Sequence, residues 1–383
     1  MRKKVCIGDL GTIITGNTPP RNRPELYGNH TPFIKATDIS ESEKYTYNPE
    51  ECYSEEGYNK YIKSLIPKGS TCVVTIGSIG KKMTMAHCDL FINQAMNAII
   101  PNACFNSEYV YYAVKNVLGN IKTLDSGTAS GRENVSKSAF SKMEIKVEEE
   151  LPIQQRIATI LSRYDSLIEN YQKQIKLLEE SAQRLYKEWF IDLRFPGHEN
   201  TKIVDGVPEE WEKKKVGNLI SKVLRTKQVS ANNYLNSGRF PVIDQSRNYI
   251  AGYTNDIDSL VEVTIPYIVF GDHTRVLKYV PFSFAKGADG TQLIMSNDLE
   301  RMPQSLFYNS LIEIDLSNYS YARHFKYLKE ESILVPSKNI AEWYDKVVSQ
   351  YLQSIQKSRD QIHHLSEARD RLLPKLMSGE IEV

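Results

Sequence analysis

Two short segments contain residue types that catalytic sites use, but each lacks the spacing that its chemistry requires. The segment GSIGKK (Gly77–Lys82) resembles a phosphate-binding loop, in which glycines and a lysine hold phosphate groups. That motif requires a glycine five residues before its Gly-Lys pair and a hydroxyl residue after the pair. Thr75 and Lys82 occupy these positions, so the segment predicts a glycine turn at the end of a strand.

Asp272-His273 could act as a general base or hold a metal ion, since both side chains take up protons and coordinate metals. No second histidine lies at ligand spacing, and His363-His364 falls in a predicted helix. The segment NTPPR (Asn17–Arg21) interrupts the Asn-Pro-Pro-aromatic order of a DNA adenine methyltransferase. The sequence therefore predicts a chain without a catalytic or metal site of its own.

Composition and length are typical of a globular protein with more than one domain. The 383 residues are too many for one ordinary core, and 41% hydrophobic with 25% charged residues are globular values. The net charge of +1 indicates that any basic, nucleic-acid-binding surface is local. The five cysteines form no Cys-x-x-Cys pair, which favours reduced thiols over disulfides or a zinc site. No stretch is long and apolar enough to cross a bilayer, and we expect a cytoplasmic protein.

Two long amphipathic helices are predicted to position the residues that bind. In the first, apolar residues recur at alternating steps of four and three, which is the spacing of a coiled-coil seam. This seam contains Ile157, Leu161, Tyr164, Ile168, Tyr171, Ile175, Leu178, Ala182, Leu185 and Trp189. The second helix has a matching series that contains Tyr351, Ile355, Ile362, Leu365 and Leu372. Ser358 and Arg369 are polar residues at seam positions of this second helix.

The segments before the two helices also resemble each other. Val5–Ile13 resembles Lys214–Lys222, and Ile66–Ser78 resembles Ile265–Thr274. Both regions contain short β-branched and aromatic runs separated by Gly, Pro, Asn and Asp, which is typical of short strands and turns. The chain therefore has the order domain, long helix, domain, long helix.

We expect the two helices to pair as an antiparallel coiled coil, because one amphipathic helix cannot bury its own apolar stripe. A helix of about 36 residues extends roughly 55 Å. Such pairing relates the domains by an approximate two-fold axis, and two-fold proteins read DNA half-sites roughly 34–36 Å or more apart. The predicted fold class is α+β: two mixed α/β domains with small β-sheets, joined by two long helices that form an antiparallel coiled coil with pseudo-two-fold symmetry.

Several segments are similar to the specificity subunit of type I restriction–modification systems. Leu151–Gly197 resembles that family's central conserved region, and Arg369–Ile381 resembles its C-terminal end. Ile66–Lys81 and Asn93–Pro101 resemble its first target-recognition domain, and Val269–Ile294 resembles a common type of second one. The resemblance implies target-recognition domains at 1–152 and 196–336, a central conserved helix at 153–195 and a C-terminal conserved helix at 337–383.

The resemblance also implies a division of labour. The chain would carry out no chemistry and bind no cofactor, and each target-recognition domain would read one half of a bipartite site in double-stranded DNA. The helices would hold two modification subunits, which use S-adenosylmethionine to methylate adenine N6. Restriction subunits, where present, would use ATP and Mg to cut unmethylated DNA. The second half of this chain is shorter than the family pattern, and its helix has polar seam residues.

Candidate binding residues follow from chemistry and position. Arg, Lys, Asn, Gln, hydroxyl and acidic side chains read bases when they lie in rigid polar loops. In the first domain these are Lys35, Thr37, Asp38, Ser78, Lys81, Lys82, Arg132 and Asn134, and in the second they are Gln245, Arg247, Asp272, His273, Arg275 and Lys286. Partner-binding candidates on the outer faces of the helices are Glu179, Arg184, Lys187, Glu188, Arg371 and Leu376. We expect the aromatic residues Tyr186, Trp189, Phe190 and Phe195 to pack one end of the helix pair against a domain.

Two other functions are open at this point. The chain could be a coiled-coil scaffold that binds proteins and does not read DNA. It could instead be a stand-alone nuclease, although the sequence shows no cluster of carboxylates with lysine and no metal-ligand pattern. The order of the repeats and the family resemblance favour a non-catalytic DNA-recognition subunit.

Overall fold

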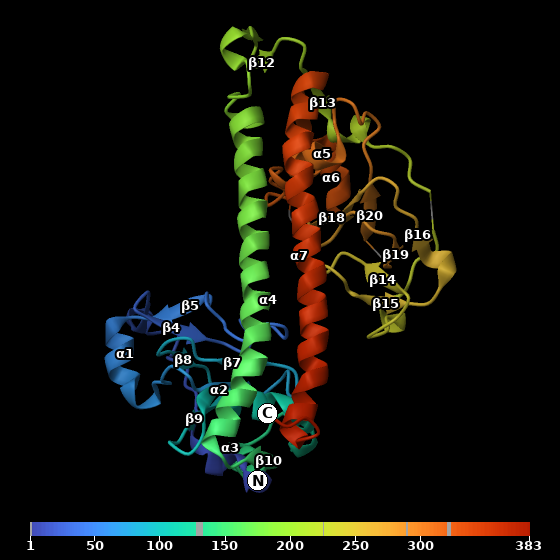
Figure 1. Ribbon diagram of the computed structural model, residues 1–383. Helices are drawn as coiled ribbons and strands as arrows, with labels where there is room; N and C mark the ends of the chain where they lie inside the picture. The colour runs from blue at the N-terminus through green and yellow to red at the C-terminus, as the bar shows by residue number, and fades with distance from the viewer. Residues whose placement is uncertain (1, 128–132, 225, 289, 320–322) are drawn as a thin grey trace. The chain divides into compact units, whose positions relative to one another are not determined.

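The structure is a computed structural model that describes residues 2–127, 133–224, 226–288, 290–319 and 323–383. The chain forms two compact units, one of residues 1–171 with 361–383 and the other of residues 172–360. Each unit contains one mixed α/β domain and a part of both long helices, α4 (Leu151–Tyr186) and α7 (Lys338–Ser378) (Figure 1). Among the described residues, none of the helices is both long and apolar enough to span a membrane.

The described residues of the first unit's domain form three small sheets. The first is the antiparallel pair β1 (Arg2–Cys6) and β10 (Glu144–Glu148). The second has the order β2-β9-β6-β7, with bounds Gly11–Thr15, Met96–Pro101, Thr71–Val74 and Met83–Met85. The third has the order β3-β5-β4-β8, with bounds Tyr27–Gly28, Glu51–Tyr53, Thr31–Ile34 and Phe91–Ile92.

Side-chain caps begin helices α1 (Glu55–Tyr61), α2 (Ser107–Asn116) and α3 (Lys137–Lys142) of this domain. Ser54, Asn106 and Ser136 each accept a hydrogen bond from a backbone N–H of the first turn. Helix α2 is buried from Tyr109 to Val114, because it lies in one core with the β2-β9-β6-β7 sheet, α4 and α7.

The domain of the second unit repeats this plan. The antiparallel pair is β13 (Glu212–Lys215) with β21 (Ser332–Val335). One sheet has the order β18-β17-β20, with bounds Leu277–Val280, Tyr267–Gly271 and Thr291–Ile294. The other has the order β15-β14-β19-β16, with bounds Gly252–Thr254, Phe240–Ile243, Phe284–Lys286 and Leu260–Val261. A short pair β11 (Ile203–Val204) and β12 (Val207–Pro208), and helices α5 (Gln304–Ile312) and α6 (His324–Glu330), complete the domain.

The internal repeat predicted from the sequence is confirmed by the strand order. In both domains a strand leads into a 3₁₀ turn, β1 into η1 (Ile7–Leu10) and β13 into η7 (Val216–Leu219). Strands β6 and β17 are each central between two antiparallel neighbours, and β4 with β8 and β14 with β19 form parallel pairs. The segments that resemble each other in sequence thus occupy equivalent positions in the two domains.

Within each unit, α4 and α7 run antiparallel. In the first unit Asp165 contacts Arg369, while Ile157 and Leu161, earlier in α4, share a core with Leu376, later in α7. In the second unit Glu179 pairs with Arg359. The seam is confirmed as an inward face, in which Ile157, Leu161, Ile168 and Ala182 are buried and Tyr164, Tyr171, Ile175, Leu178, Leu185 and Trp189 are half-buried.

The helix α4 ends in a π-helical turn, η5 (Lys187–Ile191), and the chain then turns at Gly197, where φ is +87°. The predicted aromatic packing at this end is confirmed within the second unit. Phe190 lies 5.5 Å from Trp211 and 5.1 Å from Tyr344, measured between ring centroids, and Phe195 lies 4.7 Å from Trp211. Because Trp211 directly precedes β13, these rings join both helices to the second domain.

Candidate nucleic-acid interface

In the first domain, three polar segments that are far apart in the sequence meet beyond the end of strand β6. Ile76 forms a β-bridge with Asn134, and the N–H of Gly77 donates to the carbonyl of Glu133 at 3.1 Å. The Lys82 ammonium donates to the carbonyl of Ala36 at 3.3 Å. These contacts gather segments 35–38, 76–82 and 133–134, which contain most of the first-domain candidates. Arg132 lies outside the described residues.

The candidates in this cluster differ in what their side chains already do. Hydrogen bonding to Glu50 raises the pKa of Lys35, whose ammonium also lies 3.4 Å from Glu51. Asp38 accepts a hydrogen bond from the backbone N–H of Lys35 at 2.8 Å and so closes a turn. Thr37, Ser78 and Lys81 are exposed, which makes them the members most able to reach a ligand. We name these three segments the first polar surface.

The second domain has an open cleft of about 580 Å³ beyond the end of strand β17, the equivalent of β6. It is lined by Gln228, Asp272, His273, Lys286, Gly290, Thr291, Gln292 and Arg323. Gln245 lies at its wall, where its Oε1 accepts the N–H of His273 at 3.1 Å. A Cβ at Gly290, where φ is +77°, would lie 2.8 Å from both of these side chains, so this wall requires glycine.

Asp272 has a structural role that the sequence did not predict. It was a DNA-binding candidate by residue type, but this side chain is only 4% exposed. Its Oδ1 accepts the N–H of Phe325 at 2.8 Å, and its carbonyl accepts the N–H of His324 at 2.9 Å. The carboxylate therefore holds the first turn of α6 against the end of β17, where its charge is stabilised by the helix N-terminus.

The structure separates the other second-domain candidates from the cleft. Arg275 has a left-handed backbone with φ of +62° and donates to the carbonyl of Leu316 at 3.0 Å. Arg247 borders a different hollow, of about 360 Å³, together with Glu179 and Tyr249. The cleft instead contains Gln228, Gln292 and Arg323, which were missed. Gln292 follows a glycine turn that could have identified it, whereas Gln228 and Arg323 come from distant segments without a motif.

The partner-binding candidates lie on exposed helical faces with one exception. Glu179, Arg184, Lys187, Glu188 and Arg371 are exposed. Lys187 lies 3.4 Å from Glu313, and Arg371 lies 3.7 Å from Glu367. The prediction for Leu376 was wrong in its placement, because this side chain is 1% exposed and belongs to the core of the first unit. Leucine at this position faces inward because the last turns of α7 share the apolar core of the first unit with α2 and α4.

Comparison with known proteins gives matches to type I restriction enzyme specificity subunits. Residues 2–180 match the family described as the type I restriction modification DNA specificity domain. The MjaIX type I restriction enzyme specificity subunit of Methanocaldococcus jannaschii is 27% identical over 406 residues, which cover 98% of this chain and 93% of that protein. The HindI specificity subunit of Haemophilus influenzae is 34% identical over 142 residues, 37% of this chain and 30% of that protein.

Comparison of the fold with solved structures also gives a specificity subunit. The crystal structure of a type I restriction-modification S subunit from M. genitalium superposes with a TM-score of 0.59 at 18% identity, over 98% of this chain and 96% of that one. At this identity the likeness concerns the fold alone, namely small mixed domains with long helices. Together with the repeated strand order, these matches lead to one conclusion: over almost its whole length the chain is similar to type I restriction–modification specificity subunits.

Proposed function

We propose that this chain is the DNA sequence-specificity subunit of a type I restriction–modification complex. Each domain reads one half of a bipartite site in double-stranded DNA. The observation that supports this proposal most is the repetition of the binding region. The first polar surface follows strand β6 and the cleft follows strand β17, and these two strands are equivalent in the repeated fold.

The two regions have side chains suited to different parts of DNA. Lysine, arginine and histidine can contact phosphates, which fixes the register of the protein on the duplex without reading sequence. Gln228, Gln245 and Gln292 present amides, which pair with adenine in the major groove. Thr37 and Ser78 present hydroxyl groups in the first polar surface. Positioning and reading groups thus occur together.

The complex would divide its chemistry among subunits. Helices α4 and α7 hold two modification subunits, with Glu179, Arg184, Lys187, Glu188 and Arg371 as candidate contacts. Those partners bind S-adenosylmethionine and methylate adenine N6, and restriction subunits, where present, use ATP and Mg. This chain supplies sequence recognition and no catalytic group.

A domain exchange tests the proposal. Residues 1–150 are replaced by the equivalent residues of a homologue with a different methylation site, and the complex is expressed with its modification subunits. Sequencing of methyladenine in host DNA should show one half of the bipartite site changed and the other half kept. A change in both halves, or in neither, would contradict independent reading by two domains. Absence of any sequence-dependent methylation in the parent complex would contradict the function itself.

A further inference from the structure

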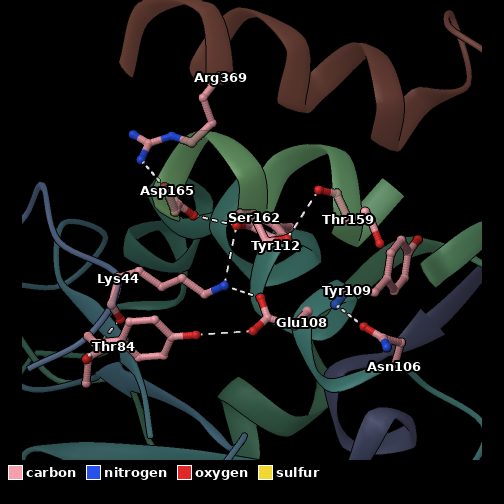
Figure 2. A network of polar contacts seen from close by, with 11 residues as sticks. Lys44, Thr84, Asn106, Glu108, Tyr109, Tyr112, Thr159, Ser162, Asp165 and Arg369 are labelled. Carbon is pink, nitrogen blue, oxygen red and sulfur yellow. Dashed lines mark hydrogen bonds and ion pairs between the residues drawn. The ribbon is translucent and has the colours of Figure 1, made fainter. Parts of the chain in front are cut away.

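A continuous series of buried polar contacts joins the first domain to both long helices (Figure 2). Arg369 of α7 donates to Oδ1 of Asp165 in α4 at 2.5 Å, and the Tyr112 hydroxyl of α2 donates to the other oxygen of that carboxylate. The Lys44 ammonium donates to the Tyr112 oxygen at 3.4 Å and is ion-paired with Glu108. We name these five residues the polar series.

Three of the four charged side chains of this series are almost fully removed from water, and the fourth, Glu108, is 32% exposed. The side chains of Lys44, Asp165 and Arg369 are 5%, 7% and 5% exposed. Each has an opposite charge in contact, and the ammonium of Lys44 also lies within 5.3 Å of the ring centroids of Tyr45, Tyr111 and Tyr112. Buried ion pairs offset their desolvation only when the geometry of the pair is good. The series therefore tolerates one arrangement of the domain on the helices.

The apolar core does not impose that restriction by itself. Ile157, Leu161 and Leu376 already bury the helix faces against the domain. Apolar packing follows area and depends little on direction, whereas hydrogen bonds and ion pairs depend on both distance and angle. The polar series thus adds orientation to an attachment that apolar burial already stabilises.

The other end of the series reaches the first polar surface. The carbonyl of Lys44 accepts the N–H of Met85 at 2.8 Å and the Thr84 hydroxyl at 3.1 Å. Both residues belong to β7, which begins directly after segment 76–82. Polar contacts therefore run from α7 through α4, α2 and Lys44 to the strand that directly follows segment 76–82 of this surface.

We propose that Asp165, Arg369, Tyr112 and Lys44 are positioning residues, which fix the angle at which the first domain presents its DNA-reading surface relative to the helices. This inference depends on the proposed function. It assigns the choice of gap length to residues that lie outside the DNA-reading surfaces. One base pair of DNA adds about 3.4 Å and roughly 35° of rotation between half-sites. A domain held at one angle rejects a gap that is one base pair too long or too short, and a loosely held domain accepts it.

The test measures gap discrimination separately from folding. Complexes are reconstituted with the modification subunits and assayed on duplexes carrying the parent's own bipartite site, with its gap unchanged, shortened or lengthened by one base pair. The first variant, Asp165→Leu with Arg369→Met, replaces the buried pair by apolar side chains, a change that proteins often tolerate in stability. We expect it to assemble, and to lose on the order of tenfold in its preference for the correct gap.

A matched pair of single variants separates positioning from stability. Tyr112→Phe removes the buried hydroxyl that bonds Asp165. Tyr47→Phe removes a hydroxyl from an exposed contact instead. In that contact the Tyr47 hydroxyl donates at 2.6 Å to Glu169, which lies in α4 as Asp165 does. Tyr112→Phe should weaken gap preference several-fold, and Tyr47→Phe should leave it within about twofold of the parent.

The outcomes distinguish the two proposals. If the parent methylates without sequence dependence, the proposed function fails. If the parent is specific and the Tyr112→Phe and Tyr47→Phe variants show the same gap preference, the positioning inference is wrong. This conclusion does not depend on whether the double variant folds. A double variant that assembles and still rejects altered gaps like the parent also overturns it. Relaxed gap preference with unchanged base preference in the second half-site supports it.

Discussion

The two units attach equivalent domains to the same two helices by different chemistry. In the first, buried charges and a tyrosine hydroxyl join Lys44, Tyr112, Asp165 and Arg369. In the second, the rings of Tyr186, Trp189, Phe190, Trp211 and Tyr344 pack together, with centroid separations between 5.1 and 6.4 Å. The first domain is thus attached to the helices through directional polar contacts, and the second domain is attached through aromatic packing.

This difference shows what each kind of contact contributes. Removing one member of a buried ion pair leaves an uncompensated charge in the core, so a single substitution there strongly lowers the free energy of unfolding. Aromatic clusters distribute their stabilisation over many contacts, and each ring pair adds about 0.5–1.5 kcal/mol beyond its burial. The first attachment should therefore be sensitive to conservative changes, and the second should tolerate them.

The largest expected effect is on the first unit. Asp165→Ala leaves Arg369 without its main partner in the core and should lower the free energy of unfolding by about 3–5 kcal/mol. Hydrogen exchange of helix α2 measures this loss locally. The double variant Asp165→Leu with Arg369→Met is the control and should recover most of it. A loss below about 1 kcal/mol in Asp165→Ala would mean that the charges are not buried as described.

A smaller effect is expected from a conservative change in the aromatic cluster. Phe190→Leu keeps an apolar side chain of similar volume and should cost about 1–2 kcal/mol. All three tryptophans, at positions 189, 211 and 343, belong to the second unit, so tryptophan fluorescence during urea unfolding reports on this unit. A cost as large as that of Asp165→Ala would remove the contrast between the two attachments.

The second unit should also show its own dependence on pH. Burial lowers the pKa of Lys278 to about 8, although Asp244 at 3.8 Å opposes the change. An unfolded lysine titrates near 10.4, so the unfolded state binds more protons between about pH 8 and pH 10. The free energy of unfolding should therefore rise with pH across this window, by up to about 1.4 kcal/mol per pH unit, and be flat just below it. Fluorescence-detected urea unfolding at pH 8.0–9.5 measures the slope, and Lys278→Met should remove it. A slope that persists in the variant would assign it to another group.

Periodicity was sufficient to predict the helices and their inward faces, and the resemblance between two pairs of segments predicted the repeated order of domains. The inward positions Ile157, Leu161 and Ile168 follow directly from apolar spacing, which the chain itself displays. The polar series could not be predicted in the same way. Arg369 was recognised as a polar residue at a seam position, but its partner Asp165 lies outside the apolar series, so periodicity does not identify it.

The candidate binding regions were predicted only in part, because tertiary folding assembles them. His273 and Lys286 were identified by residue type and do line the cleft, whereas Arg323 reaches it from a segment without a motif. Asp272 was identified for the wrong reason, since its carboxylate holds the first turn of α6. The sequence alone does not distinguish a buried polar side chain that stabilises a neighbouring element from one that binds a ligand.

The shared helices affect the order in which the chain can mature during translation. The core of the first unit includes Leu373, Leu376 and Met377 of α7, and Arg2 donates to the carbonyl of Leu376 at 2.7 Å. An emerging first domain must therefore wait for residues 373–377 to be made before its apolar surface is closed. Ribosomes add about 5–20 residues per second, so this interval lasts on the order of ten seconds or more. During this interval the nascent chain exposes an apolar patch to which chaperones can bind. The last turns of α7 then bury the apolar surface of the domain that was made first.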